Sequence, residues 1–174
     1  EKVESNPVLS PERPWEGNAV RLGHVVFDDS DQLFKMWYTG QQYSAEQGDG
    51  EVIVRGEFED PPPVPCLATS EDGVSWERPN LGLVEFRGSR DNNIFLTGEA
   101  ASAQFDGCVT NWDGHTIVRD EEEENPERRY KMIAHWETSH VWDNRVHKLD
   151  RPEKDMERFW AHRAKYITYS PDGL

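Results

Sequence analysis

The stretch Cys66-Leu67-Ala68-Thr69-Ser70-Glu71-Asp72-Gly73-Val74-Ser75-Trp76 has the pattern of a β-strand that runs into a tight turn. In the motif Ser-x-Asp-Gly-x-x-Trp, the Asp carboxylate can accept backbone N–H groups of the turn, the Gly can adopt a positive φ, and the Trp can cover the base of the hairpin. The first part of the motif returns 100 residues later as Tyr169-Ser170-Pro171-Asp172-Gly173. A motif that recurs at such a distance indicates a repeated structural unit.

Two more landmarks recur in the same order as the turn motif. Gly23–Asp29 matches Gly114–Asp120 at an offset of 91 residues, and Phe34–Trp37 matches Tyr130–Ile133 at an offset of 96 residues. This alignment places His24 and His115 at matched positions of the two copies. Offsets that grow slowly along the chain are typical of a repeat with insertions in its loops.

Each copy of the repeat predicts antiparallel β-structure. Runs of β-branched and aromatic residues alternate with turn-forming residues, which indicates short strands joined by hairpins. The spacing of Met156, Phe159 and Trp160 predicts one helix over 151–164. The expected strands are 25–27, 34–38 and 66–70 in the first copy and 116–118 and 130–135 in the second, with 83–86 and 93–96 as material for an outer strand.

The order of strand, tight turn, strand, loop, strand and Asp-Gly hairpin is the content of one β-propeller blade, and propellers have about four to eight blades. The all-β chain 1–174 is therefore expected to form a single incomplete propeller domain. Its first repeat covers about 19–97 and its truncated second repeat about 106–174. The remaining blades would come from a C-terminal continuation or from another chain.

Composition excludes several classes of partner. The chain has 174 residues, a net charge of −15 and an aromatic content of 11%, with seven Trp. The negative charge argues against binding to nucleic acid and to anionic membrane surfaces. The sequence contains no apolar run of about 18 residues, so no membrane span is predicted. Two cysteines, Cys66 and Cys108, are too few for a disulfide framework, so two buried thiols are expected, with a single bridge as the alternative.

The sequence resembles bacterial glycoside hydrolase family 32/43-like five-bladed β-propellers. The resemblance implies a five-bladed propeller of which this chain is the N-terminal portion, and an oligo- or polysaccharide substrate cleaved at a glycosidic bond. It also implies three acidic residues near the propeller axis, and the third of these acids would fall in a blade beyond this chain. The similarity rests on Asn6-Pro7-Val8-Leu9, Pro14-Trp15-Glu16, Phe34-Lys35-Met36-Trp37-Tyr38, the string from Ala68 to Pro79, Leu81-Gly82-Leu83-Val84-Glu85-Phe86, Asp91-Asn92-Asn93-Ile94 and Arg129-Tyr130-Lys131-Met132.

Candidate site residues follow from the positions of acids, histidines and tryptophans near the starts of the expected inner strands. Glu16 and Asp113 are the candidate catalytic carboxylates, because glycoside hydrolysis uses a pair of acids. Each stands beside a glycine, so simple turn chemistry is the alternative. Indole faces stack on sugar rings, and imidazole or guanidinium groups can bind hydroxyls. The candidate substrate-binding residues are Trp15, Arg21, His24, Trp112, His115, Trp136 and Trp142.

Other features have simpler interpretations. Trp37 and Trp76 lie inside the blade pattern and are expected in the core. The acids of 28–31 and 121–124 fit solvated turns, and no spacing predicts a metal or cofactor site. Two insertions, 41–65 and 136–165, are expected to line a substrate cleft or to contact a partner subunit. No carboxylate stands at the start of the first inner strand, so a non-catalytic glycan-binding propeller is the alternative to a hydrolase.

Overall fold

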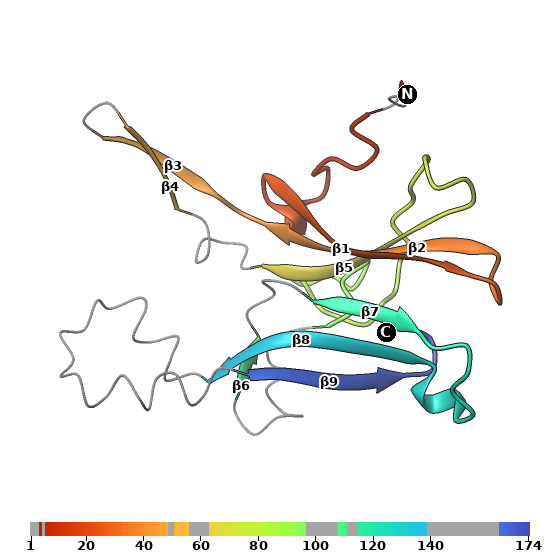
Figure 1. Cartoon of the computed structure of the whole chain (residues 1–174). Helices are drawn as coiled ribbons and strands as arrows, with labels where there is room; N and C mark the ends of the chain where they lie inside the picture. Colours follow the sequence, from red (N-terminus) through yellow and green to blue (C-terminus); the bar gives the residue numbers. More distant parts are fainter. Residues whose placement is uncertain are drawn as a thin grey trace, which may run out of the picture. The chain divides into compact units, whose positions relative to one another are not determined.

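The computed structural model describes residues 4, 6–48, 51–55, 63–96, 108–110, 115–138 and 164–174. The chain divides into two compact units, Glu1–Leu96 and Thr97–Leu174. Each unit is built around its own antiparallel sheet (Figure 1). In the described part of the chain, regular structure consists of strands and of two three-residue 3-10 turns, η1 (Pro14–Glu16) and η2 (Pro126–Arg128). The predicted all-β class is therefore confirmed.

The first unit contains a three-stranded sheet. Strands β1 (Ala19–Asp28), β2 (Leu33–Gln41) and β5 (Val64–Ser70) lie in the order β1-β2-β5, and both neighbouring pairs are antiparallel. A bulge lies between Leu22 and His24 in β1. The first insertion forms a separate hairpin of β3 (Ser44–Gly48) and β4 (Glu51–Arg55), which was expected only as a loop.

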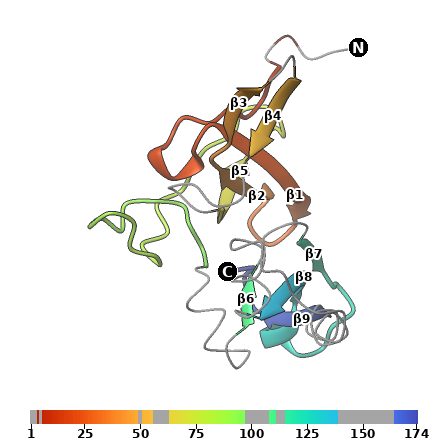
Figure 2. The same cartoon turned by 90° about the vertical axis from the view of Figure 1, so that its left-hand side faces the viewer.

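The second unit contains a four-stranded sheet (Figure 2). Strand β8 (Tyr130–Thr138) is central, because β9 (Ala164–Ser170) pairs along one of its edges while β6 (Cys108–Thr110) and β7 (Thr116–Arg119) pair with the other. The two short strands β6 and β7 together take the place that the long strand β1 has in the first unit.

Strand pairing confirms two of the three repeat offsets. Phe34 pairs with Ser70 in the first unit and Tyr130 pairs with Ser170 in the second, which reproduces the offsets of 96 and 100 residues. The buried ion pair of Lys35 with Asp28, at 2.6 Å, also returns as Lys131 with Asp120, at 2.5 Å. The two sheets are therefore copies of one unit down to the side chains of their first hairpins.

The remaining offset, the one of 91 residues that matched His24 with His115, is wrong. His24 pairs with Trp37, whose counterpart 96 residues later is Ile133, and Ile133 pairs with Thr116. The equivalent of His24 is therefore Thr116. A shift of one residue moves a side chain to the other face of a strand, so the two histidines do not form a matched pair.

Between β6 and β7 the second copy carries two more residues than the first. Val20 pairs with Gly40, and Thr110 pairs with Trp136, so the offset is 90 residues at this point and 92 at Thr116. The additional residues fall where β1 has its bulge. An alignment without gaps therefore gives an offset of 91, which lies between these two values.

The largest hydrophobic cluster of the first unit lies on one face of its sheet, and Trp37 and Leu67 are buried on the other face. Segments before β1 and after β5 cover the face with the cluster, but 83–86 and 93–96 form isolated bridges instead of the expected outer strand. Trp37 is fully buried, as predicted, and Cys66 is a buried free thiol. The core cluster consists of Met36, Tyr38, Cys66, Ala68 and Ile94, with Leu9, Trp15, Val20, Val64, Trp76, Val84 and Phe86 packed against it.

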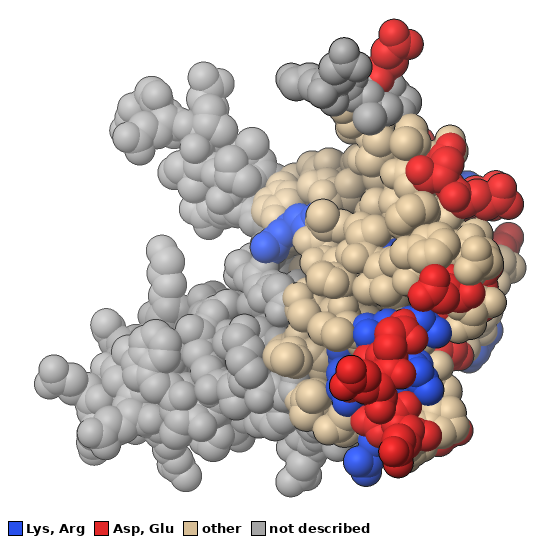
Figure 3. Space-filling view, turned by 45° about the vertical axis from the view of Figure 1, so that its right-hand side comes forward, with Lys and Arg blue, Asp and Glu red and all other residues tan. Residues whose placement is uncertain are grey.

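Charged side chains gather at the turn between β7 and β8, where acidic and basic groups are intermixed (Figure 3). Lys131 pairs with Glu123 at 3.0 Å as well as with Asp120, and Glu121 pairs with Arg119 and Arg129. The acidic run that looked like a solvated hairpin tip is therefore partly neutralised by ion pairs. In the first unit Asp28 is buried, so the expected solvated turn is wrong at that residue.

The expected helix at 151–164 lies outside the described residues, except that Ala164 begins β9. Nothing in the described part of the chain is a helix long and apolar enough to cross a membrane.

Candidate functional site

Glu16, the predicted catalytic acid of the first unit, is the centre of a buried polar cluster. It ends the 3-10 turn η1, and it has no exposed surface. Its carboxylate accepts hydrogen bonds from the backbone N–H of Glu12 at 2.7 Å and of Arg13 at 2.9 Å. The Arg78 guanidinium donates from Nε at 2.7 Å and from Nη2 at 3.2 Å, and the Tyr38 hydroxyl donates at 2.5 Å. These donors fill the lone pairs of both oxygens.

The cluster extends from Glu16 across the sheet. The Asn93 amide donates to the Tyr38 hydroxyl and to the Leu67 carbonyl, each at 2.7 Å. Its carbonyl oxygen accepts from the Trp15 indole N–H at 2.8 Å. Arg78 also donates to the Ser10 carbonyl at 2.6 Å. This Glu16 cluster (Trp15, Glu16, Tyr38, Arg78 and Asn93) thus fastens the segment before β1 and the segment after β5 to the same strands.

Two glycines let η1 approach β2 closely enough to form the cluster. A Cβ on Gly40 would lie 2.5 Å from the Cα of Glu16, and a Cβ on Gly17 would lie 2.5 Å from the carbonyl oxygen of Gln41. Both distances are far below van der Waals contact, and both obstacles are backbone. Backbone approach of this kind is a common reason for glycine inside or beside a strand.

Burial and hydrogen bonding act in opposite directions on these groups. Burial by itself raises the pKa of Glu16, but the donors from Arg78, Tyr38 and the two backbone amides outweigh burial and hold the pKa below its ordinary value of 4.5. Burial, followed by the nearby Cys66 and Glu16, raises the pKa of Tyr38. The cluster therefore holds an ionised carboxylate next to a neutral phenol.

This geometry makes the Glu16 carboxylate an anchor. A general acid or nucleophile must reach the bond that it cleaves, whereas Glu16 is turned into the protein and has its acceptor positions filled. Trp15 is half-buried and holds Asn93 through its indole N–H. Trp15 and Glu16, the two predicted site residues of the Pro-Trp-Glu turn, thus belong to one hydrogen-bond network, and the contacts observed in it hold the fold together.

A second polar group, the Arg21 cluster (Arg21, Gln41 and Tyr43), includes residues of the other face of the sheet. Arg21 pairs with Thr39 and His24 pairs with Trp37, whereas Tyr38 of the Glu16 cluster pairs with Leu22. Side chains alternate between faces along a strand, so Arg21 and His24 share the face that is turned away from Glu16. The structure therefore separates the predicted residues of the first unit into two sets.

Gln41 organises the Arg21 cluster. Its buried side-chain oxygen accepts from the Tyr43 hydroxyl at 2.8 Å and from Arg21 Nη1 at 3.4 Å. Arg21 is exposed, while His24 and Tyr43 are half-buried. Exposed donors held by a buried acceptor are suited to binding ligand hydroxyls or carboxylates. Sequence reasoning singled out Arg21 and His24 but missed Gln41 and Tyr43, because no motif marks them.

Two of the predicted residues of the second unit, His115 and Trp136, lie in its described part. His115 is buried and directly precedes β7. The backbone of Trp136 pairs with Thr110 and with Ala164 in β8. Trp112, Asp113 and Trp142 lie outside the described residues. Irregularities in strands often adjoin functional sites, and the sequence places Trp112 and Asp113 within the interruption between β6 and β7.

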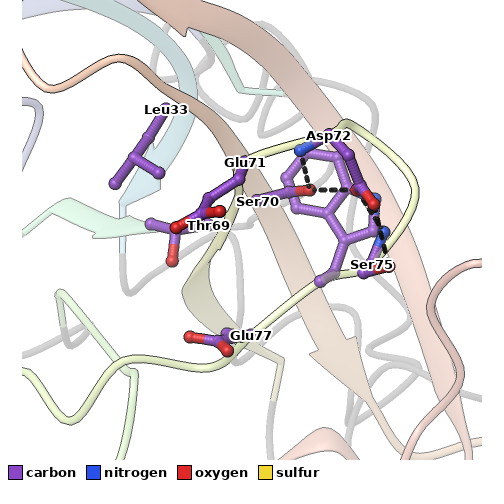
Figure 4. A pocket seen from close by; sticks show the side chains of 8 residues that line it. Leu33, Thr69, Ser70, Glu71, Asp72, Ser75 and Glu77 are labelled. Atoms are coloured by element: carbon purple, nitrogen blue, oxygen red, sulfur yellow. Dashed lines mark hydrogen bonds between the residues drawn. The ribbon is translucent and has the colours of Figure 1, made fainter.

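A surface pocket of about 350 Å³ lies beside the turn that follows β5 (Figure 4). Asp72 is occupied by the turn itself, because it accepts from the backbone N–H of Val74 at 2.7 Å and of Ser75 at 2.6 Å. These hydrogen bonds hold the pKa of Asp72 far below its ordinary value. The pocket is lined by Leu33, Thr69, Ser70, Glu71, Asp72, Ser75, Trp76 and Glu77.

The second unit repeats this turn. Ser170 and Asp172 are joined at 3.0 Å, as Ser70 and Asp72 are, and Gly173 donates its N–H to the Ser170 hydroxyl at 2.6 Å, as Gly73 does to Ser70 at 2.8 Å. A network that returns in both copies serves the fold. The turn thus has the local hydrogen bonding that the sequence motif predicts, and its aspartate is not available for catalysis.

Among the described side chains no group of three or more His, Cys, Asp or Glu residues could hold a metal ion. Comparison of the chain with protein families, with curated proteins and with solved structures finds no match.

Proposed function

We propose that this chain is part of a β-propeller that binds carbohydrate and hydrolyses glycosidic bonds. The observation that carries the proposal is the structural repeat: two antiparallel sheets share strand order, register, a Lys–Asp ion pair and the Ser-x-Asp-Gly turn. Radial repetition of such sheets is the principle of a propeller. The resemblance to family 32/43-like hydrolases then supports a five-bladed ring and a carbohydrate substrate.

In this proposal the Arg21 cluster binds sugar hydroxyls. Arg21 supplies charged donors, Tyr43 supplies a hydroxyl, and Gln41 holds both in place. Trp112, Trp136 and Trp142 supply stacking faces, as the sequence predicts. Hydrolysis needs one carboxylic acid to protonate the leaving oxygen and one carboxylate to act on the sugar or on water. Asp113 is the candidate for one of these roles, and Glu16 acts as a positioning residue that holds η1 against β2.

The test measures sugar binding and turnover by the same protein. Isothermal calorimetry with a panel of oligosaccharides should detect saturable binding, and Arg21→Ala should weaken it about tenfold, as expected for the loss of a charged hydrogen bond. Arg90→Ala is the matched control, since Arg90 is an exposed arginine of a loop that donates to the Leu83 carbonyl. Equal binding by both variants would remove the Arg21 cluster from the proposal.

A non-catalytic glycan-binding propeller is the second candidate. The burial of Glu16 within its ion pair favours it, because the predicted acid of the first unit is not free to react. Release of reducing sugar separates the two functions. Turnover that is lost in Asp113→Asn with binding retained supports the hydrolase, whereas binding without turnover in the unmodified protein supports the second candidate.

A further inference from the structure

Two later stretches of the first unit bond to the outer edge of β5, which is the edge turned away from β2. Glu77 and Thr69 exchange two backbone hydrogen bonds, with N···O distances of 2.8 and 2.9 Å. The N–H of Leu67 donates to the backbone carbonyl of Asn93 at 3.0 Å. The first unit therefore covers this edge of its sheet with backbone from later in the chain.

Strand β9 of the second unit has an equivalent outer edge. It pairs with β8 in the register in which β5 pairs with β2, so Ile167 takes the position of Leu67 and Tyr169 that of Thr69. In an antiparallel ladder the backbone groups of successive residues point alternately to the two sides of the strand. The N–H and C=O groups of Ile167 and Tyr169 thus point away from β8.

Within the described part of the chain, nothing bonds to this outer edge of β9. The strand pairs there with β8 alone and borders the second sheet (Figure 1). The side chain of Ile167 is 45% exposed, whereas its equivalent Leu67 is 5% exposed. Leu174 is the equivalent of Val74, which precedes both stretches that bond to β5. The edge of β9 is therefore accessible in the second unit where it is covered in the first.

The composition of β9 suits it to pairing with a further strand. An edge strand with unpaired N–H and C=O groups is a template for another chain, and proteins usually block such edges with proline, bulges or charges. The seven residues Ala-Lys-Tyr-Ile-Thr-Tyr-Ser contain no proline and one charge, and they pair with β8 without a bulge. Aromatic and β-branched residues dominate the strand, and both kinds favour β-structure.

The first unit also shows which side chains an added segment needs. The Asn93 side-chain amide donates to the Leu67 carbonyl at 2.7 Å, so one asparagine satisfies both backbone groups of one edge residue. The Asn92 side chain accepts from the N–H of Ile94 at 3.0 Å and so fixes the turn into the bridge. Ile94 itself is fully buried. An Asn-Asn-aliphatic pattern in an extended segment is thus the chemistry that recognises this edge.

We propose that the outer edge of β9 is a docking site for an extended segment with the pattern Asn-Asn-aliphatic, which adds antiparallel to β9 as 93–95 adds to β5. The second asparagine of the segment bonds to both backbone groups of Ile167. Addition of a strand to a sheet edge is a common mode of peptide recognition, in which main-chain hydrogen bonds supply the affinity. The inference rests on the repeat and on the edge of β9, and it does not depend on the proposed action on carbohydrate.

The test uses a synthetic peptide with the sequence of residues 75–96 and measures amide hydrogen exchange of the chain by NMR. In the chain alone, the amides of Ile167 and Tyr169 should exchange quickly, because they point away from β8. The amides of Tyr166 and Thr168 point to β8 and should be protected throughout. Saturating peptide should slow exchange at Ile167 and Tyr169 about tenfold or more and leave the other two amides unchanged.

Two proline variants locate the contact on the edge. Ile167→Pro removes the N–H that bonds to the segment and should weaken peptide binding about tenfold in calorimetry. Lys165→Pro is the matched control, because its equivalent Pro65 offers only a carbonyl, which accepts from the N–H of Phe95 at 3.1 Å. The control should bind peptide like the unmodified chain. Circular dichroism verifies folding, and a peptide with Asn93→Ala, which should also bind about tenfold more weakly, tests the same contact without altering the chain.

Several outcomes contradict the proposal. Protection of Ile167 and Tyr169 in the chain alone at every concentration would show that the chain covers this edge itself. Protection that rises with the concentration of the chain would assign the edge to a second copy, and the proposed occupant would be wrong. Exchange that millimolar peptide leaves unchanged, or equal weakening of peptide binding by both proline variants, would overturn the docking site.

Discussion

At the scale of single residues, Glu16 shows how a buried charge becomes a structural part. Taking a carboxylate out of water costs several kcal/mol, and only a close cation with further hydrogen bonds offsets that cost. Glu16 has such partners in Arg78, Tyr38 and two backbone amides. The donors that stabilise the charge also fill the acceptor positions of the carboxylate. Because these donors come from three segments of the first unit, Glu16 links the three segments.

Replacement of Glu16 by Gln should destabilise the first unit by about 3 kcal/mol, because the buried Arg78 would lose its buried counter-charge and keep only the exposed Glu12. The measurement is urea unfolding followed by tryptophan fluorescence. Glu12→Gln is the control, since Glu12 is bound to the same arginine at 3.3 Å but is largely exposed. Loss of that surface pair should cost below about 1 kcal/mol. Similar losses for both variants would show that burial does not govern the Glu16 pair.

Acid should weaken the first unit through the same group. The pKa of Glu16 is lower in the folded protein than its ordinary value of 4.5, so folding favours the ionised carboxylate. Its contribution to stability is complete above the unfolded-state pKa and is lost as the pH falls through the lower folded-state pKa. Urea midpoints measured from neutral pH into the acid range should fall below about pH 4.5, and this fall should be smaller in Glu16→Gln. An equal fall in both proteins would assign the acid sensitivity to other groups.

At the scale of elements, β2 is the strand on which the first unit depends. It pairs on both sides, and its side chains are buried from Lys35 to Gln41. Gly40 lies within this run, and because it has no side chain the backbone of η1 can come into contact with β2 there. The strand thus positions both polar groups of the first unit, with Tyr38 directed to Glu16 and Gln41 directed to Arg21.

Gly40→Ala should therefore separate η1 from β2 and destabilise the protein by several kcal/mol. The added methyl group meets the Glu16 Cα and the Trp15 carbonyl, which are backbone atoms and cannot rotate away. Gly82→Ala serves as the comparison, because nothing lies within 4 Å of its Cβ and only its φ of +67° opposes alanine. That strain costs about 1 kcal/mol. Thermal melts of both variants test the difference, and equal melting temperatures would rule out the steric explanation.

Elements also show where local sequence patterns are sufficient and where they are not. The strands 34–38, 66–70 and 130–135 were predictable because β-branched and aromatic runs are bounded by turn residues. The hairpin β3–β4 was not predicted, because 41–65 mixes glycine, acids and short apolar runs. An outer strand at 83–86 was predicted from an apolar run, but Val84 and Phe86 instead pack against the core cluster, and this segment has only an isolated bridge between Phe86 and Ser89.

At the scale of the whole molecule, the two units differ in exposure more than in architecture. Equivalent side chains such as Trp37 and Ile133 have opposite environments although they occupy the same register position.

The sequence by itself determined the repeat, the all-β class and the local chemistry of the turns. These features depend on residues close together in the chain: Asp72 needs only Ser70, Val74 and Ser75, and a strand needs only its alternating pattern. The tertiary structure alone decided which residues meet across the sheet. Glu16 contacts Arg78, 62 positions away, and Trp15 contacts Asn93, 78 positions away. A shift of one residue in strand pairing makes Thr116, and not His115, the equivalent of His24. Register and burial arise from packing between distant segments, and no local pattern encodes them.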